Sequence, residues 1–356
     1  MPATPRSILI LGASYGSLLG AKLALAGHHA TLVCLPTEAE TINAQGLRTR
    51  LPIKGRDGSI EIDSRSAPGR IAACTPKQAD PSAHALVALA MQEPQYRHPS
   101  VRALLRRIGQ AGVPVLSIMN MPPLPYLARL SGLDTAALHH AYTDPSVWEA
   151  IEPAKITLAS PDPQAFRPPE EGPNVLQVTL ATNFKTARFE SDADTALLRT
   201  LAADIDAVRY EIDGTAHPLP VKLKVHASVF VPLAKWAMLL SGNYRCVTPG
   251  GPRAICEAVH SDLALTREVY DWVRGVCQRL GAAEGDLVPF EKYAAAAEIL
   301  AKPSSAARAL YAGAPAIERV DRLVHTIAAR LGTSHPEVER TVALIDDRLS
   351  ANTQAA

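Results

Sequence analysis

The sequence lacks the features that mark disulfide-linked, zinc-binding and membrane-spanning proteins. Its five cysteines are odd in number, widely spaced and never arranged as a C-x-x-C pair, which argues against a disulfide framework and a zinc knuckle. No run of about 18 apolar residues predicts a membrane span. The first predicted strand begins too close to Met1 to leave room for a signal peptide. These absences predict a cytoplasmic protein.

An excess of charge of either sign is also lacking. The chain carries 36 lysines and arginines against 35 aspartates and glutamates, a net charge of +1, so we expect neither nucleic acid nor a membrane surface as a partner. Adjacent histidines at 28–29 and 139–140 do not face one another on a helix, and no metal site is predicted. The 356 residues with 47% hydrophobic content are enough for two domains with ordinary cores.

The chain is organised around the segment from Ser7 to Leu35. An apolar run at 8–11 predicts a buried strand, a turn follows at 12–16, and a helical pattern leads to a second strand. This βαβ unit is the kind that places a dinucleotide pyrophosphate at a helix N-terminus. The G-x-G-x-x-G pattern is incomplete, because serines stand at its second and third glycine positions. The predicted cofactor-binding residues in the turn are Gly12, Ala13, Ser14, Tyr15, Gly16 and Ser17.

Strands continue to alternate with helices beyond this unit. The pattern predicts the α/β class, with an N-terminal Rossmann-type doubly wound sheet and a second, all-helical C-terminal domain. The ligand crevice of such a sheet lies at the carboxyl ends of its strands, where Gln92 and Asn120 fall. The stretch 213–220 has the composition of a linker. We therefore expect a dinucleotide-binding domain over residues 1–218 and a substrate and dimerisation domain over residues 219–356.

A long apolar helix predicted over residues 227–240 contains a single charge, Lys235. Asn243 follows roughly 12 Å further along an ideal helix, broadly on the same side. One interpretation is that the lysine and the amide flank one ligand, because a lone cation on an apolar helix usually has an anionic partner. The other is structural: the ammonium reaches the surface and Asn243 caps the helix.

Three further groups have alternative interpretations. Ser304 and Ser305 begin a helix whose N–H groups either hold an anion or are simply capped by serine. Glu318 is either a ligand-binding carboxylate or the partner of Arg322, four residues on. His226 ends a Lys-Leu-Lys-Val-His segment whose alternation, if extended, puts its polar residues on one face. The alternative for that segment is a solvated entry to the long helix.

The order of these motifs resembles the ketopantoate reductase family. The resemblance covers about the whole chain, with extra residues between 122 and 190. It implies an N-terminal Rossmann domain, a helical C-terminal domain and reduction of the ketone of a 2-oxo acid by NADPH. It is carried by GASYGSLLGAKLALAGHHATLV, INAQGL, the apolar strand before Gln92, Asn120, the helix with Lys235 and Asn243, Pro-Ser-Ser at 303–305 and the glutamate-bearing helix.

The resemblance also implies roles for individual residues. Lys235 falls where the family has its catalytic lysine, whose ammonium hydrogen-bonds the substrate carbonyl and protonates the new alkoxide. Asn243 falls on an asparagine that binds substrate hydroxyl groups, and Asn120 on one near the nicotinamide. Ser304 or Ser305 matches a serine that binds the substrate carboxylate.

Three positions depart from the residues that the family pattern implies. Ser14 replaces the second fingerprint glycine, and Gln92 replaces a lysine expected after the fourth strand. Strict spacing puts Ile317 at the family glutamate, so Glu318 reaches that position only if one residue is inserted.

A fourth departure lies after the second strand. The family arginine that grips the 2′-phosphate of NADPH is Leu35 here, which removes a contact worth roughly 1.5–3 kcal/mol. No acidic residue replaces it to hold a ribose diol, so NAD is not positively indicated either. The candidates to supply a cation instead are Arg48, Arg50 and Lys54.

The leading hypothesis is an NAD(P)H-dependent reductase of a small 2-oxo acid or related carbonyl compound, and a homodimer. NADP is the expected cofactor, with NAD or no cofactor as alternatives. Two other hypotheses keep the fold: a cofactor-independent lyase or hydrolase using Lys235 and His226, and a non-catalytic dinucleotide or metabolite sensor. The predicted catalytic residues are Lys235, Asn243 and Glu318; the substrate-binding residues are Asn120, Ser304, Ser305 and His226; Gln92 and Asn120 join the cofactor-binding turn.

Overall fold

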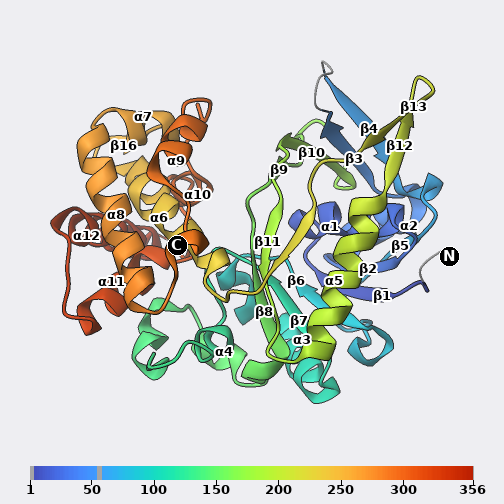
Figure 1. Cartoon of the computed structure of the whole chain (residues 1–356), viewed down its shortest axis with the longest axis horizontal. Helices are drawn as coiled ribbons and strands as arrows, with labels where there is room; N and C mark the ends of the chain where they lie inside the picture. The colour runs from blue at the N-terminus through green and yellow to red at the C-terminus, as the bar shows by residue number, and fades with distance from the viewer. Residues whose placement is uncertain (1–3, 54–57, 356) are drawn as a thin grey trace. The chain divides into compact units, whose positions relative to one another are not determined.

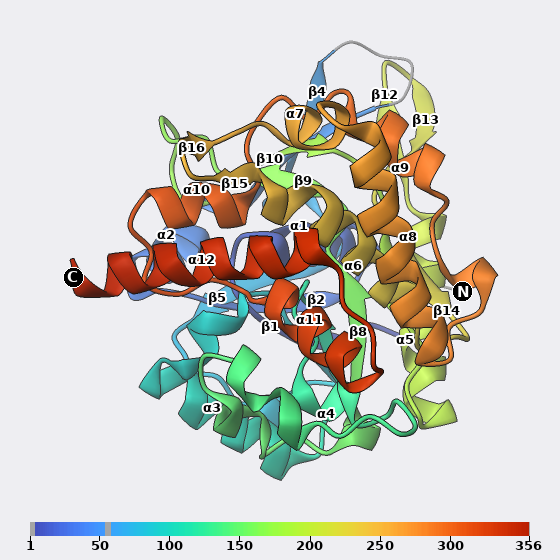
Figure 2. The same ribbon diagram turned by 90° about the vertical axis from the view of Figure 1, so that its left-hand side faces the viewer.

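The computed structural model describes residues 4–53 and 58–355, and the chain divides into two compact units (Figures 1 and 2). Each unit combines segments that are far apart in the sequence. Unit 1 takes residues 1–91, 95–129 and 146–227; unit 2 takes residues 92–94, 130–145 and 228–356.

An eight-stranded sheet forms the centre of unit 1. Its order is β14-β11-β8-β7-β6-β1-β2-β5, and every neighbouring pair except β8 and β11 is parallel. The predicted doubly wound, mainly parallel sheet is confirmed. Its central strands are buried on both faces and mainly apolar, with Ser117 and Thr157 as fully buried polar residues. The strands are β1 (Ser7–Leu11), β2 (His29–Val33), β5 (Arg70–Cys74), β6 (Leu86–Leu89), β7 (Val115–Ile118), β8 (Ile156–Ser160), β11 (Phe184–Ala187) and β14 (Leu223–His226).

Helices connect these strands and pack on the sheet. Ser191 caps α5, since its hydroxyl accepts a hydrogen bond from the Asp194 N–H at 3.2 Å. The α-helices of unit 1 are α1 (Tyr15–Leu25), α2 (Pro36–Gln45), α3 (Pro99–Ala111), α4 (Leu124–Leu127) and α5 (Asp192–Ala207).

A smaller four-stranded sheet, in the order β4-β3-β10-β9, brings the extra residues between 122 and 190 beside the N-terminal part of the chain. β3 pairs antiparallel with β4, and residues 54–57 between them lie outside the described residues. β10 pairs parallel with β3 and antiparallel with β9. The strands are β3 (Arg48–Pro52), β4 (Ser59–Asp63), β9 (Gln164–Phe166) and β10 (Val175–Leu180).

Unit 2 is helical apart from one two-residue ladder within the described part of the chain. Its core is formed by the apolar sides of α8 and α11, where Val273 and Val324 are fully buried. The α-helices are α6 (Lys235–Met238), α7 (Ile255–His260), α8 (Leu263–Arg279), α9 (Phe290–Ala297), α10 (Ser305–Tyr311), α11 (Val320–Arg330) and α12 (Pro336–Gln354), and the ladder joins β15 (Val247–Thr248) to β16 (Gly251–Pro252).

The division between the units differs from the predicted boundary at 218. Residues 213–220 are not a linker: β12 (Arg209–Ile212) and β13 (Thr215–Pro218) form a hairpin, and the chain then adds β14 to the main sheet. Asp213 and Gly214 have φ of 50° and 75°, so the turn signal marked the tip of this hairpin. The units separate after Ala227.

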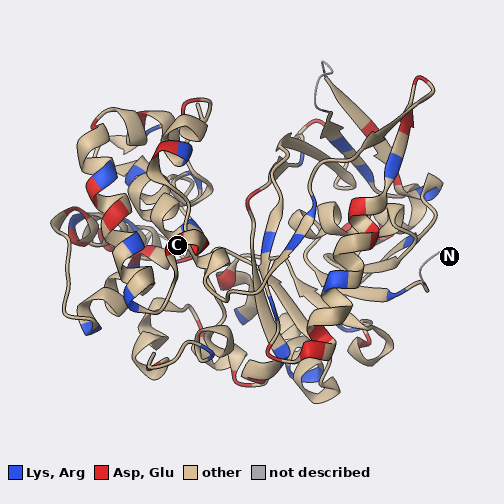
Figure 3. Cartoon of the chain, viewed as in Figure 1, with Lys and Arg blue, Asp and Glu red and all other residues tan. Residues whose placement is uncertain are grey.

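No helix within residues 4–53 and 58–355 is long and apolar enough to cross a membrane. Basic and acidic residues are interspersed along the backbone of each unit (Figure 3). Over the same described residues, no group of three or more His, Cys, Asp or Glu side chains is arranged to hold a metal ion.

Lys22 buries an ammonium group on α1. Its side chain is fully buried, and Nζ donates to the Pro220 carbonyl at 2.9 Å. Burial, together with the charge of Lys222 and against that of Asp206, lowers the pKa of Lys22 from 10.5 to about 8. Between these values the unfolded chain binds more protons than the folded one, so the free energy of unfolding rises with pH.

We expect Lys22→Met to raise the free energy of unfolding at pH 7 by up to roughly 3 kcal/mol, less the lost hydrogen bond. Below about pH 8, Lys22 of the wild type is protonated in both the folded and the unfolded state, and the buried charge lowers the free energy of unfolding by its full amount. The difference in free energy of unfolding between Lys22→Met and the wild type should therefore shrink as the pH rises toward 10.5. Urea unfolding across that range measures it, with the exposed Lys77→Met as control. A difference between Lys22→Met and the wild type that is independent of pH would contradict the assignment.

Candidate functional site

The turn after β1 depends on two glycines. Gly12 has a φ of 102°, which L side chains rarely adopt, and a Cβ there would lie 2.7 Å from the Ala90 carbonyl oxygen. Gly16 lies in the first turn of α1, where a Cβ would lie 2.6 Å from Cγ2 of Ile10. Gly16 therefore lets α1 pack directly on β1, which is the role of the third glycine in a dinucleotide fingerprint.

Serines stand at the second and third glycine positions of the G-x-G-x-x-G pattern, residues 14 and 17. Ser14 is exposed and precedes α1, and in the described chain neither its side chain nor an acidic residue of the first turn caps this helix. The positive end of the α1 dipole is therefore not neutralised by its own helix. Ser17 is fully buried, and its hydroxyl donates to the Ala13 carbonyl, so this side chain stabilises the turn itself.

A segment far along the chain lies against this turn. Arg167, directly after β9, donates from Nη2 to the Ala13 carbonyl at 2.6 Å and pairs through Nη1 with Glu38 in the first turn of α2. The Tyr15 hydroxyl donates to the Pro163 carbonyl at 2.8 Å. Sequence reasoning missed Arg167 because 154 residues separate it from Ala13 and no short motif links the two.

Gln92 and Asn120 lie just beyond the carboxyl ends of β6 and β7, as predicted. Gln92 is exposed and belongs to unit 2, whereas Asn120 is half-buried and belongs to unit 1. Their contact with a cofactor stays a prediction.

The segment that ends at His226 is extended as β14. Lys222 and Lys224 both pair with Asp206, so they share a face and their charges are met by a surface carboxylate. This favours the solvated interpretation for the two lysines. His226 is half-exposed, and its carbonyl accepts a hydrogen bond from the Arg188 N–H at 2.9 Å.

The segment around Lys235 is not the single regular helix predicted over residues 227–240. A 3-10 turn at Val231–Ala234 leads into α6, and the backbone then widens into a π-helical turn at Leu239–Asn243. A π turn accommodates an extra residue and occurs frequently at functional sites. It changes the angle between Lys235 and Asn243 from that of an ideal helix. Lys235 is half-exposed and Asn243 half-buried.

Asn243 does not cap this helical segment. Its own backbone is helical, with φ of −59° and ψ of −46°, and its side chain makes no capping hydrogen bond within the described chain. The backbone that carries it is held by Arg245, whose buried guanidinium donates to Glu337 at 3.0 Å, to Thr266 at 2.6 Å and to two carbonyls at 3.1 Å. These bonds compensate the burial of the charge.

Glu318 lies two residues before α11 and is only 8% exposed. Its Oε1 accepts a hydrogen bond from the Glu93 N–H at 3.3 Å, and its carbonyl accepts one from the Tyr244 hydroxyl at 2.6 Å. Arg322, the alternative partner predicted for Glu318, pairs with Asp346. The structure thus gives Glu318 a buried environment rather than a place on a helix surface.

Glu93 is a second buried carboxylate in this part of unit 2. It is 2% exposed and accepts hydrogen bonds from the N–H and hydroxyl of Thr143, at 3.0 and 2.8 Å. Burial, and then the charge of Glu93, raises the pKa of the Tyr142 hydroxyl well above its usual value. Sequence reasoning missed Glu93, although its position directly after Gln92 at a strand end was a usable signal.

The two serines predicted to bind an anion differ in their environment. Ser304 is 3% exposed; its hydroxyl donates to the Asn243 carbonyl at 2.7 Å and accepts from the Ala307 N–H at 3.2 Å. It therefore caps α10, as the structural interpretation held. Ser305 is exposed.

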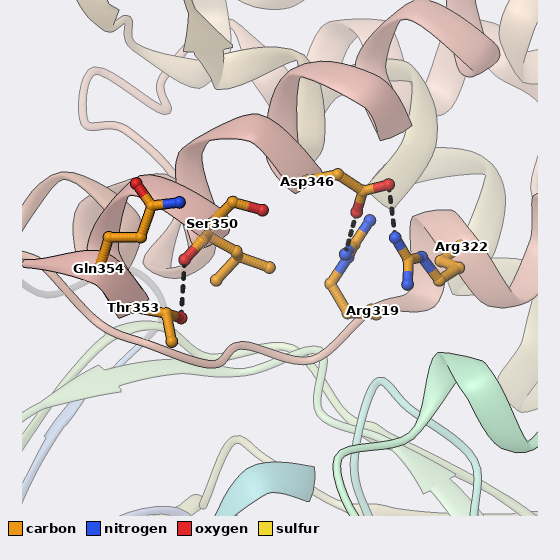
Figure 4. Close-up of a pocket in the computed structure, with 7 residues that line it drawn as sticks. Arg319, Arg322, Asp346, Ser350, Thr353 and Gln354 are labelled. Carbon is orange, nitrogen blue, oxygen red and sulfur yellow. Dashed lines mark hydrogen bonds and ion pairs between the residues drawn. The ribbon is translucent and has the colours of Figure 1, made fainter. Parts of the chain in front are cut away.

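Unit 2 also contains a pocket of about 410 Å³. The guanidinium groups of Arg319 and Arg322 both point to the Asp346 carboxylate (Figure 4), and Arg319 also pairs with Asp321. Burial alone would raise the pKa of Asp346, but the Arg322 hydrogen bond and the Arg319 charge outweigh it and lower that pKa. The charges of this pocket are satisfied internally. Its lining is Arg319, Arg322, Asp346, Leu349, Ser350, Thr353 and Gln354.

Ser304→Ala is expected to lower the free energy of unfolding by about 1–2 kcal/mol, because it removes a helix cap and a hydrogen bond to Asn243. Ser305→Ala, which changes an exposed hydroxyl, should stay within about 0.5 kcal/mol of the wild type. Urea unfolding of both variants makes the comparison. Equal effects would show that Ser304 has no structural role beyond that of its neighbour.

Solved structures share this fold over nearly the whole chain. A protein from Ralstonia solanacearum MolK2 described as a ketopantoate reductase has a TM-score of 0.66 and 17% identity, covering 98% of this chain and 99% of its own. The 2-dehydropantoate 2-reductase of Methylococcus capsulatus has a TM-score of 0.63 and 16% identity, and the match covers 98% of both chains. A D-mandelate dehydrogenase solved with NADH and anilino(oxo)acetate has a TM-score of 0.63 and 15% identity, and the match covers 98% of this chain and 99% of that one.

These likenesses confirm, at the level of the fold, the resemblance to ketopantoate reductases that the sequence motifs indicated. No protein-family model and no curated protein sequence matches the chain. With identities of 15–17%, the comparison establishes the architecture of the chain, and its chemistry has to be argued from its own residues.

Proposed function

We propose that this chain is a nicotinamide-dependent reductase of a small 2-oxo acid or a related carbonyl compound. The observation that carries the proposal is the turn after β1. Gly12 allows a tight turn there, Gly16 allows α1 to pack closely on β1, and α1 has no side-chain cap at its N-terminus. The shared fold supports the same class: one such structure is of a 2-dehydropantoate 2-reductase, and another holds NADH with anilino(oxo)acetate.

The residues of unit 1 fit a dinucleotide. The first N–H groups of α1 would bind the pyrophosphate at the positive end of the helix dipole. Gly12 keeps the preceding turn tight, and Ser17 stiffens it through the Ala13 carbonyl. Asn120 and Gln92 remain the predicted contacts of the cofactor beyond the turn. The bound nicotinamide would supply the hydride.

In unit 2, Lys235 would act on the substrate carbonyl. Its ammonium would donate a hydrogen bond to the carbonyl oxygen and then its proton to the alkoxide oxygen, a step that general acids accelerate typically ~10²–10⁴-fold. The Asn243 amide would orient polar groups of the substrate. Of the two serines, Ser305 is the better candidate for the substrate carboxylate, because both hydrogen-bonding roles of Ser304 are structural.

The buried Glu318 would complete the predicted catalytic set, and His226 stays a predicted substrate contact. A homodimer and a cytoplasmic location are the remaining parts of the proposal, and both rest on the sequence.

Lys235→Met is expected to lower kcat by roughly 10²–10⁴-fold while leaving dinucleotide affinity unchanged, because the thioether side chain cannot donate a proton. Lys292→Met, on an exposed position of α9, is the matched control. Steady-state oxidation of the reduced nicotinamide with a panel of 2-oxo acids, and calorimetry with the same cofactors, provide the two measurements.

Full turnover by Lys235→Met would reject Lys235 as the proton donor. Product formed without any nicotinamide would favour the cofactor-independent lyase or hydrolase instead. Dinucleotide binding without turnover of any carbonyl compound would favour the sensor.

A further inference from the structure

The end of β2 has an acidic group that the sequence pattern concealed. Leu35, two residues after β2, is 66% exposed, and α2 begins at the next residue. Glu38, in the first turn of α2, folds its side chain back so that Oε2 accepts a hydrogen bond from the Leu35 N–H at 3.3 Å. The carboxylate therefore lies at the end of β2, although Glu38 belongs to the following helix.

Arg167 ties this carboxylate to the turn after β1. Its Nη1 pairs with Oε1 of Glu38, and its Nη2 donates to the Ala13 carbonyl at 2.6 Å. The Arg167 and Glu38 side chains are 26% and 17% exposed, so both reach solvent. In a Rossmann sheet the turn after the first strand and the end of the second bound the place of the adenosine ribose. The Glu38–Arg167 pair stands at that place.

The other cations considered for a 2′-phosphate are engaged elsewhere or undescribed. Arg48 pairs with Glu171 at 3.3 Å and with Glu61 at 3.7 Å. Arg50 pairs with the same two carboxylates at 2.5 and 2.8 Å. Lys54 lies outside the described residues. The Glu38–Arg167 pair itself consists of one carboxylate and one guanidinium, so its net charge is zero.

Building on the proposed function, we infer that the Glu38–Arg167 pair selects the dinucleotide without a 2′-phosphate, NAD(H), over NADP(H). The Glu38 carboxylate accepts hydrogen bonds from the ribose hydroxyls, the role that an acidic residue has in NAD-binding Rossmann sheets. A carboxylate oxygen has lone pairs for both a guanidinium and a hydroxyl, so Glu38 keeps its partner when it binds ribose. Arg167 is a positioning residue that holds the carboxylate in place.

A 2′-phosphate would be repelled at the place where the ribose hydroxyls are bound. Its roughly two negative charges would lie beside the Glu38 carboxylate. The positive charge of Arg167 is already offset by Glu38, so the pair presents no net positive charge to the phosphate. Leu35 offers no charge where the resembling family has an arginine. NAD(H) thus takes the place of the NADPH that the family resemblance implied, and Glu38 is an acidic residue at the end of β2 that the sequence pattern did not reveal.

The test is calorimetric binding of NADH and NADPH to the full-length wild type and to three variants. The wild type should bind NADH about tenfold or more tightly than NADPH. Glu38→Gln removes the negative charge but keeps a side chain that can cap α2, and should shift the affinity ratio about tenfold toward NADPH. Arg167→Gln leaves the carboxylate without its cation and should shift the ratio further toward NADH.

Glu40→Gln, which removes an exposed carboxylate from the same helix, is the matched control and should leave the ratio unchanged. Thermal unfolding without cofactor verifies that each variant is folded. Tighter binding of NADPH than of NADH by the wild type would overturn the inference and leave the proposed function standing. An unchanged ratio in Glu38→Gln would also overturn it. Binding of neither dinucleotide would overturn the proposed function and the inference together.

Discussion

The close approach of α1 to β1 is the constraint on which unit 1 depends. It exists because residue 16 has no Cβ, which would lie 2.6 Å from a methyl group of Ile10. With the helix on the strand, the turn between them is short, Gly12 is held at positive φ, and the Ala13 carbonyl accepts from both Ser17 and Arg167. The extra residues that carry Arg167 are seated by the pairing of β10 with β3. The turn is thus tight although serines stand at two of the three fingerprint positions.

Unit 2 depends on buried polar groups in the same way. Arg245 donates hydrogen bonds to Glu337, Thr266 and two carbonyls, and these bonds hold the end of the segment that begins with Lys235. Glu318 and Glu93 are brought together from 225 residues apart. Because a buried charge without partners is strongly unfavourable, such groups fix the backbone around them. In this way the bonds of Arg245 hold the end of the segment that carries Lys235 and Asn243, for which we propose contact with the substrate.

Part of the candidate site was predictable from the sequence and part was not. Lys235 stood out because it is the single charge on an apolar segment, and the turn at Gly12–Gly16 because glycines interrupt an apolar strand and a helix. The π turn between Lys235 and Asn243 was not predictable, since helical periodicity assumes a regular rise and angle. Nor was the structural role of Ser304, because a capping serine and an anion-binding serine have the same sequence signature.

The sequence by itself determined the architecture: the order of strands and helices, the mainly parallel sheet, the helical second half and the likeness to ketopantoate reductases. Periodicity and turn residues encode these locally, over a few residues each. Only the tertiary structure decided the chemistry at the end of β2. There, an acidic residue reaches back from α2 and an arginine arrives from β9, because sheet pairing joins segments that no local pattern relates. Leu35 by itself indicated the loss of a cation; together with Glu38 and Arg167 it is the basis of our inference that the cofactor has a free 2′-hydroxyl.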